Sequence, residues 1–280
     1  MLSLSVPEIH DTSRRLITET WARLLRAIFP AQCAACERRL TDDPVPFFCR
    51  TCWGQIRPLS GPACPRCDRP FPSPIASTFS PTHLCGDCRK RTPSFTKAWS
   101  LYPYDTPLRE AIALLKYRGK YGMASPLCHL LMAALPASLD VDVVMPVPLH
   151  PARLRGREYN QSLLLAQAVS RQLAKPLSYS NLIRVIDTAA QTTLPRSARL
   201  SNLRHAFRLR TPRTVQGQRV LVVDDVFTTG TTLHECAKAL RKAGAGDVYV
   251  LTLARTVDRG LLPDHHLPAV SKNQLQFAGL

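Results

Sequence analysis

The stretch Val220-Leu-Val-Val-Asp-Asp-Val-Phe-Thr-Thr-Gly-Thr-Thr232 decides the fold of this 280-residue chain. Its four apolar residues, 220–223, predict a strand that is buried on both faces, as in the centre of a parallel sheet. Asp224 and Asp225 stand at the C-terminal end of this expected strand. A loop of hydroxyl residues follows, and then a helix is expected from about Leu233 to Ala243. This order places polar groups at the carboxyl edge of a sheet, where open α/β folds bind ligands.

The residue types in this loop fit a sugar phosphate. Unpaired N–H groups and the dipole at a helix N-terminus favour an anion. Paired carboxylates accept hydrogen bonds from the hydroxyls of a polyol such as ribose. A strand and helix with coincidental acids is the alternative, but buried carboxylates without partners are costly. We therefore interpret the segment as a ribose 5-phosphate cradle.

The same segment resembles the phosphoribosyl diphosphate (PRPP) motif of type I phosphoribosyltransferases. Every polar position of that motif is matched, and only Phe227 stands where an aliphatic residue is usual. The resemblance implies that Asp224 and Asp225 are catalytic, because they hold the ribose hydroxyls and stabilise positive charge at C1. It also implies Mg²⁺ bound with PRPP. The implied 5′-phosphate ligands are Thr228, Thr229, Gly230, Thr231 and Thr232.

Eight of the ten cysteines form four Cys-x-x-Cys pairs within residues 33–88. Each such turn directs two thiolates at one tetrahedral ion, so two turns complete a site. A single pair could be a redox motif, but four pairs in a short region indicate zinc. The expected ligands of two structural Zn²⁺ ions are Cys33, Cys36, Cys49, Cys52, Cys64, Cys67, Cys85 and Cys88.

The pairing of these cysteines is open at this point. Sequential use gives two zinc ribbons, and an interleaved cross-brace is the alternative. Pro58, Gly61 and Pro62 suggest a hinge between two modules, which favours sequential use. A four-thiolate site has no open coordination position, so the metal is expected to stabilise the fold rather than to catalyse.

The formal net charge of the chain is +17, and the excess is unevenly distributed. Residues 153–219 contain thirteen Lys or Arg and only two acidic residues, Glu158 and Asp187. Such a cluster indicates phosphate binding, either of a small substrate or of nucleic acid. A solvated charged surface is the alternative.

The compartment is predicted from what the sequence does not contain. Residues 1–15 do not resemble a signal peptide, and no run of eighteen apolar residues occurs. We therefore expect a cytoplasmic protein without a membrane span. Thiols stay reduced in the cytoplasm, which also favours metal sites over disulfides.

Strands alternate with helices after residue 98, which predicts an α/β fold with a parallel sheet. The expected strands are 98–104, 141–147, 220–223 and 248–254, and the expected helices are 107–116, 125–135, 160–173 and 233–243. The expected organisation is a flexible N-terminus (1–17), a helix plus double zinc ribbon (18–97), the α/β domain (98–257) and a flexible tail (258–280).

Five short motifs, in this order, resemble the ComF family of competence-associated proteins, which includes GntX-like members. They are Leu115-Lys-Tyr-Arg-Gly119, Pro146-Val-Pro-Leu-His150 with Arg153, Arg157-Glu-Tyr-Asn-Gln161, Thr188-Ala-Ala-Gln-Thr192, and Arg199-Leu-Ser-Asn202 before Ala206-Phe207. The family joins a double zinc ribbon to a type I phosphoribosyltransferase-like domain.

The family resemblance also implies roles for individual residues. Residues 148–153 would form a pyrophosphate loop, and residues 116–120 and 153–161 would form a flexible hood over the active site. The residues carried over to the loop and the hood are Pro148, Leu149, His150, Arg153, Arg157, Asn160 and Gln161.

Two functional hypotheses follow. The first is a PRPP-binding protein, and possible phosphoribosyltransferase, of DNA uptake (competence) or nucleotide metabolism. The second is a protein that binds single-stranded nucleic acid, or an adaptor for DNA-uptake proteins, with a non-catalytic transferase fold. Phosphate-backbone binding needs little more than Lys and Arg. Aromatic residues for base stacking are few near the basic stretch: Tyr117, Tyr121 and Tyr159.

Overall fold

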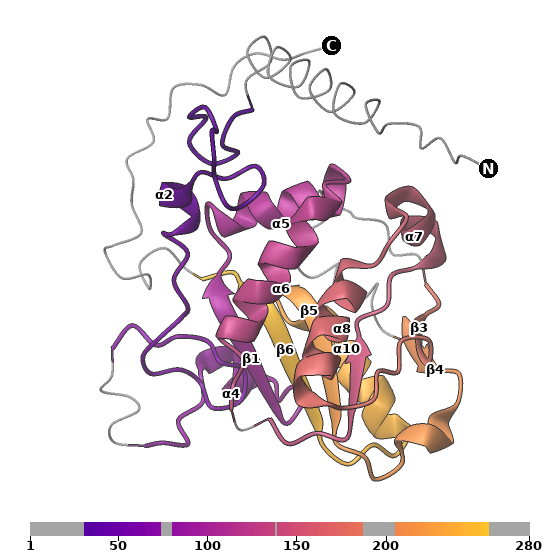
Figure 1. The fold of residues 1–280 in the computed structure, drawn as a ribbon. Helices are drawn as coiled ribbons and strands as arrows, with labels where there is room; N and C mark the ends of the chain where they lie inside the picture. Colours follow the sequence, from indigo (N-terminus) through magenta and orange to yellow (C-terminus); the bar gives the residue numbers. More distant parts are fainter. Residues whose placement is uncertain (1–30, 74–79, 138, 187–204, 258–280) are drawn as a thin grey trace, which may run out of the picture. The chain divides into compact units, whose positions relative to one another are not determined.

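The computed structural model describes residues 31–73, 80–137, 139–186 and 205–257 (Figure 1). The chain divides into two compact units, one ending at Gly54 and the other beginning at Gln55. The first unit contains helix α2 (Arg50–Trp53) and four of the cysteines. The second contains the other paired cysteines and the sheet. The helix expected within 18–29 and the tail from 258 lie outside the described residues.

The second unit is built on a parallel sheet with the strand order β1-β6-β5-β2. Its strands are β1 (Lys97–Pro103), β6 (Val248–Arg255), β5 (Val220–Phe227) and β2 (Val143–Pro146). Each overlaps an expected segment. The residues from Val220 to Val223 are buried, because β5 lies between two other strands and is covered on both faces. The structure thus confirms the predicted parallel α/β fold.

Strand β5 is longer than the sequence predicts. The expected strand ended at Val223, with the acids beyond it. In the structure the pairing with β6 continues from Asp224, opposite Thr252, to Phe227, opposite Arg255. The acid pair therefore lies within the last half of the strand, because β6 is long enough to continue the hydrogen-bonded ladder.

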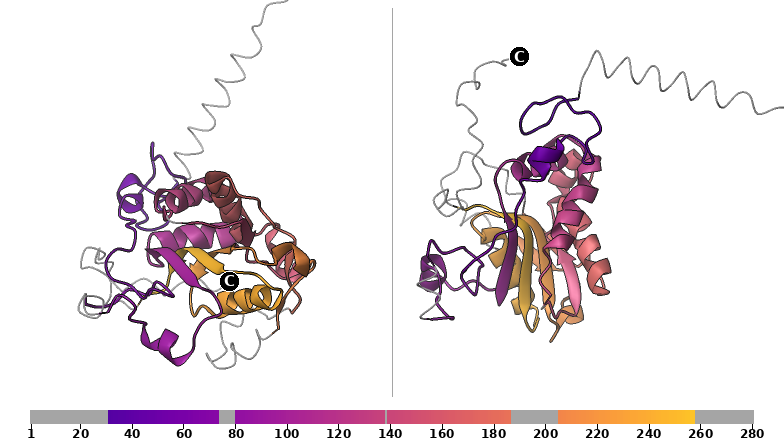
Figure 2. Two further views of the ribbon diagram at one scale, coloured as in Figure 1. Left: turned by 90° about the horizontal axis from the view of Figure 1, so that it is seen from below. Right: turned by 60° about the vertical axis from the view of Figure 1, so that its left-hand side comes forward.

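Helices cover both faces of the sheet. On one face lie α5 (Leu108–Tyr117), α6 (Ala124–Ala133) and α8 (Gln161–Leu173), and on the other lies α10 (Thr231–Lys242), as Figure 2 shows. All four match helices expected from apolar periodicity. Among the described residues, no helix combines the length and the apolar character needed to cross a bilayer.

Several short elements were not predicted. Helix α7 (Pro151–Arg157) follows β2, and β3 (Leu182–Arg184) pairs antiparallel with β4 (Phe207–Leu209) in a separate two-stranded sheet. The remaining short elements are α4 (Gly86–Lys90), η1 (Tyr121–Met123) and η2 (Pro212–Val215). Such lengths are too short for periodicity to distinguish.

The second group of cysteines packs into the core of the sheet-containing unit. Cys64, Cys67, Cys85 and Cys88 belong to the same buried cluster as residues of β5, β6 and α10. Backbone contacts add to this packing: Ala98 N–H donates to the Arg66 carbonyl at 2.8 Å, and Arg255 Nη1 donates to the Cys67 carbonyl at 2.6 Å. The second ribbon is therefore part of this unit and does not form a separate domain.

Candidate functional site

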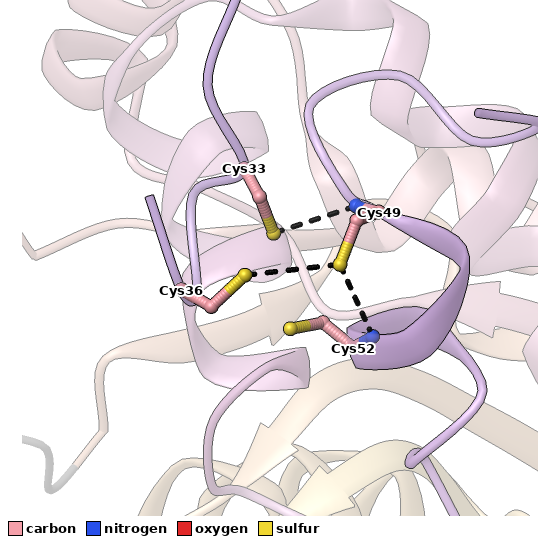
Figure 3. Close-up of side chains that lie close together, drawn as sticks. All are labelled: Cys33, Cys36, Cys49 and Cys52. Carbon is pink, nitrogen blue, oxygen red and sulfur yellow. Dashed lines mark hydrogen bonds between the residues drawn. The ribbon is translucent and has the colours of Figure 1, made fainter. Parts of the chain in front are cut away.

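Each four-cysteine group has the geometry of a metal site. The sulfurs of Cys33, Cys36, Cys49 and Cys52 all lie within 4.8 Å of one another, and their side chains converge (Figure 3). Cys36 Sγ and Cys49 Sγ are 3.8 Å apart. A tetrahedral zinc ion with bonds of about 2.3 Å places its sulfur ligands ~3.8 Å apart, so the spacing fits Zn²⁺.

The second group repeats this arrangement with Cys64, Cys67, Cys85 and Cys88, whose sulfurs also lie within 4.8 Å of one another. Cys67 Sγ and Cys85 Sγ are 3.6 Å apart. The two groups are therefore sequential, which is the pairing that the sequence favoured over a cross-brace. Cys128 and Cys236 belong to neither group.

The local backbone explains why these turns present thiolates. In both ribbons the residue four positions after the first cysteine has a positive φ, 62° at Glu37 and 61° at Asp68. Backbone N–H groups donate to sulfur at 3.4 Å, from Cys49 to Cys33 and from Cys85 to Cys64. Such hydrogen bonds stabilise the charged form of the thiol, which is the form that binds metal.

The acid pair of β5 is held by residues from two helices. Lys116 Nζ, at the end of α5, lies 2.8 Å from Asp225 Oδ1, and both side chains are largely buried, with 15% and 7% exposed. Ser162 Oγ, in the first turn of α8, donates to Asp224 Oδ1 at 2.7 Å. The second oxygen of Asp225 is buried and has no hydrogen-bond partner in the described part of the chain.

This environment raises the pKa of Asp224 and that of Lys116. Burial, followed by the neighbouring charge of Asp225, raises the pKa of Asp224 to about 7. Burial alone would lower the pKa of Lys116, but the Asp225 carboxylate outweighs it and the net shift is upward. The site therefore contains a carboxyl group that changes charge near neutral pH beside a lysine that stays protonated.

The loop after β5 leads directly into a helix N-terminus. It connects Phe227 to the N-terminus of α10 at Thr231, and Thr229 Oγ1 lies 2.9 Å from Thr231 Oγ1. Gly230 has φ of 73°, and a Cβ at this position would lie 2.6 Å from Cζ of Phe227. Glycine avoids this clash and adopts the positive φ without strain. The absence of a side chain at Gly230 leaves room for the aromatic ring of Phe227.

The two segments expected to form a hood contact each other. Arg157 lies over the Tyr117 ring at 4.8 Å, and Tyr121 Oη donates to Glu158 Oε2 at 2.6 Å. The rings of Tyr121 and Tyr159 are 4.6 Å apart. Tyr117 and Tyr121 are exposed, and Arg157 is the α7 arginine that contacts one of these tyrosines.

Three of the carried-over residues also have clear structural roles. His150 caps α7, accepting from Ala152 N–H at 3.3 Å. Asn160 caps α8 through Ser162 N–H and donates to the Val147 carbonyl, each at 3.0 Å. Gln161 is buried and accepts a hydrogen bond from Arg157.

Arg153 lies in the middle of α7, so the expected pyrophosphate loop becomes helical from Pro151. Proline suits a first helical position, since its missing N–H would be unpaired there.

Sequence reasoning missed several residues around the loop. A cavity of about 700 Å³ borders residues 227–231, and its lining includes Arg91 after the second ribbon's last cysteine, His234 of α10 and Arg255 of β6. No local motif marks these positions, because the fold brings them together from distant segments. Ser162 was missed for the same reason. Thr188, Gln191 and Arg199 lie outside the described residues.

Two family models match the chain. A double zinc ribbon domain matches residues 24–89, and a phosphoribosyl transferase domain matches residues 160–279. Together with the parallel sheet and the two cysteine groups, they define the class: a zinc-ribbon protein with a phosphoribosyltransferase-like domain.

Two relatives and one solved structure show the similarity to known proteins. The chain is 37% identical over 201 residues to DNA utilization protein YhgH of Escherichia coli strain K12, covering 69% of this chain and 84% of that protein. It is 34% identical over 222 residues to Competence protein F of Haemophilus influenzae, covering 75% and 97%. Orotate phosphoribosyltransferase from Aeropyrum pernix is 24% identical over 53% of this chain and 64% of that one, with a TM-score of 0.32. The chain belongs to the ComF family of competence-associated proteins.

Proposed function

We propose that this protein binds PRPP, or a closely related ribose 5-phosphate, at the acid pair and the loop that follows it. Asp224 and Asp225 hold the ribose hydroxyls. The N–H groups and hydroxyls of residues 228–232 hold the 5′-phosphate, with the positive end of α10 behind them. Residues 148–161 lie over the diphosphate and contribute positive charge.

The observation that supports this proposal most strongly is the environment of the Asp225 carboxylate. Its Oδ2 is buried and has no hydrogen-bond partner among the described residues. A buried carboxylate oxygen without a donor costs roughly 1–3 kcal/mol or more. Ribose hydroxyls are donors of the kind that this oxygen lacks. The adjacent phosphate-type loop gives the same ligand a second point of attachment.

The acid pair also suits phosphoribosyl transfer. When the bond between C1 and the diphosphate breaks, positive charge develops on the ribose. Two carboxylates beside the ring stabilise that charge more in the transition state than in the ground state. Mg²⁺ would be held mainly by the diphosphate oxygens and would neutralise the leaving group. We propose this reaction class together with the binding function.

A second candidate function is binding of single-stranded nucleic acid. It is favoured by Tyr117, Tyr121 and Tyr159 together with Arg157 of α7, which lies over the Tyr117 ring, because they combine stacking surfaces with positive charge. Relatives are called DNA utilization protein and Competence protein F. Both functions can share one surface, because a diphosphate and a nucleic-acid backbone attract the same cations.

Calorimetry with PRPP and Mg²⁺ tests the first proposal. Asp225→Asn removes a charged acceptor and is expected to weaken binding about ten- to hundredfold. Asp42→Asn, at an exposed position of the first unit, is the matched control and should bind as the wild type does. Equal affinities for all three proteins would remove the assignment of the ribose site.

A further inference from the structure

The cavity beside the phosphate loop is walled partly by the second zinc ribbon. It measures about 700 Å³, and its lining includes residues 228–231 as well as Arg69, Lys90 and Arg91 of the ribbon. Cavities of this size hold whole small molecules, whereas a single phosphate occupies much less. A ligand bound through its 5′-phosphate at the loop therefore has room to continue toward the ribbon.

The lining is strongly cationic. Four of its side chains are Arg or Lys, and Asp87 is its one acidic residue, paired with Arg69 at 2.8 Å. Part of this positive charge balances the tetrathiolate zinc centre, which has a formal charge of about −2. Arg255 is only 4% exposed, stacks on Phe227 at 4.9 Å, and has a buried Nε without a hydrogen-bond partner among the described residues.

Arg91 is directed toward His234 instead of toward the sulfurs. Its Nη2 lies 3.2 Å from His234 Nε2, while Ser94 N–H donates to His234 Nδ1 at 3.0 Å. A neutral imidazole has one acceptor nitrogen and one N–H, so it cannot accept from both neighbours. With Nδ1 as the acceptor, Nε2–H and the Arg91 guanidinium are two donors that point into the same space. An anion between them accepts a hydrogen bond from each, so that both donors have an acceptor.

We propose that Arg91 and His234 form a second anion subsite, so that the zinc ribbon selects ligands with a further phosphate on the 5′ side of the loop-bound phosphate. This proposal rests on the assignment of residues 228–232 as the 5′-phosphate site. The shared chemistry is a second phosphate, and it has two possible sources: a nucleoside 5′-diphosphate or the 5′ end of an oligonucleotide.

Two ligand pairs that each differ by one phosphate test the proposal. The first pair is AMP and ADP, and the second is the dinucleotide pTpT, which has a 5′-monophosphate, and its 5′-diphosphate form ppTpT. We expect wild-type protein to prefer the longer member of at least one pair, and the preferred pair identifies the source. Arg91→Ala should reduce that preference by about five- to tenfold, as for loss of a partly exposed charged hydrogen bond.

Two further variants separate this subsite from general effects. Arg89→Ala removes an exposed arginine from α4, the helix that ends just before Arg91, outside the cavity lining, and should leave the preference unchanged. His234→Asn keeps an acceptor for Ser94 N–H but loses the Nε2 donor, and should reduce the preference as Arg91→Ala does. Retained wild-type preference in both Arg91→Ala and His234→Asn would overturn the subsite, as would the absence of any preference in wild type.

Failure of the subsite proposal can be distinguished from failure of the proposed function. If Asp225→Asn leaves PRPP binding unchanged while Arg91→Ala still removes the preference, the subsite stands and the ribose assignment is wrong. If Asp225→Asn weakens PRPP binding while Arg91→Ala has no effect on either pair, the ribose assignment stands and the subsite is wrong.

Discussion

Asp224 is the residue whose ionisation controls the proposed ribose site. Its pKa is raised to about 7, mainly by burial. Above that pH it is a carboxylate that accepts ribose hydroxyls, and below it the protonated group is a poorer acceptor. PRPP affinity is therefore expected to fall as pH is lowered through about 7, by at most about tenfold per unit. Calorimetry between pH 5.5 and 8.5 measures this dependence.

The ligand's own phosphates also take up protons in this range, with a second pKa near ~6. Asp224→Asn is the control, because it retains the ligand's contribution and lacks that of the aspartate. Parallel pH profiles for the wild type and this variant would contradict the assigned role of Asp224.

Lys116 and Asp225 form the buried ion pair of the site, with Nζ and Oδ1 2.8 Å apart. Removing one partner leaves an uncompensated buried charge, which typically costs about 3–5 kcal/mol. Lys116→Met should therefore lower the free energy of unfolding by a few kcal/mol, and the double variant with Asp225→Asn should recover much of that loss. Urea denaturation of the four proteins measures this coupling, and additive effects would show that the pair is not coupled.

At the scale of elements, α7 connects the two functional hypotheses. It carries Arg153, Arg155 and Arg157, and Arg157 lies over the Tyr117 ring. If it binds a nucleic-acid backbone, affinity for a single-stranded oligonucleotide falls with salt, with a slope of roughly −0.7 per phosphate neutralised. The triple alanine variant should flatten that slope by about two units.

A control for this variant comes from the same basic stretch. Arg208, Arg210 and Arg213 are exposed and lie in or near β4 and η2. Their triple alanine variant changes the net charge equally and should affect the slope less. Identical slopes for the two triple variants would assign the effect to net charge instead of to α7.

The elements also show what the sequence could predict. Strands β5 and β6 and helices α5, α8 and α10 were predicted because long apolar runs and periodic faces are properties of contiguous residues. The β3–β4 pair has three residues in each strand and joins segments more than twenty residues apart. The contact of Arg91 with His234 joins positions 143 residues apart. Such pairings depend on tertiary packing, so no local pattern indicates them.

For the whole molecule, the two zinc centres should differ in what they stabilise. The second is part of the buried core of the sheet-containing unit, and the first lies in the other unit. Cys64→Ser is therefore expected to lower the melting temperature of that unit by roughly 6–12 °C, for a loss of about 3 kcal/mol. Cys33→Ser should leave this transition nearly unchanged. Differential scanning calorimetry of the two variants measures these melting temperatures.

Elemental analysis should accompany these scans. Two zinc ions per chain are expected in the wild type and about one in each variant, since each variant loses one four-thiolate site. A wild-type content near zero in folded, reduced protein would contradict the metal assignment. Equal melting shifts in Cys33→Ser and Cys64→Ser would contradict the structural difference between the two centres.

The most direct test of the central claim is calorimetric titration of wild-type protein with PRPP and Mg²⁺, repeated in the presence of a saturating single-stranded oligonucleotide. We expect one saturable PRPP site per chain, binding that requires Mg²⁺, and displacement by ribose 5-phosphate. We also expect weaker PRPP binding when the oligonucleotide occupies the surface beside the site. An oligonucleotide that binds with the salt dependence described above, while PRPP neither binds nor competes with it, would contradict the claim.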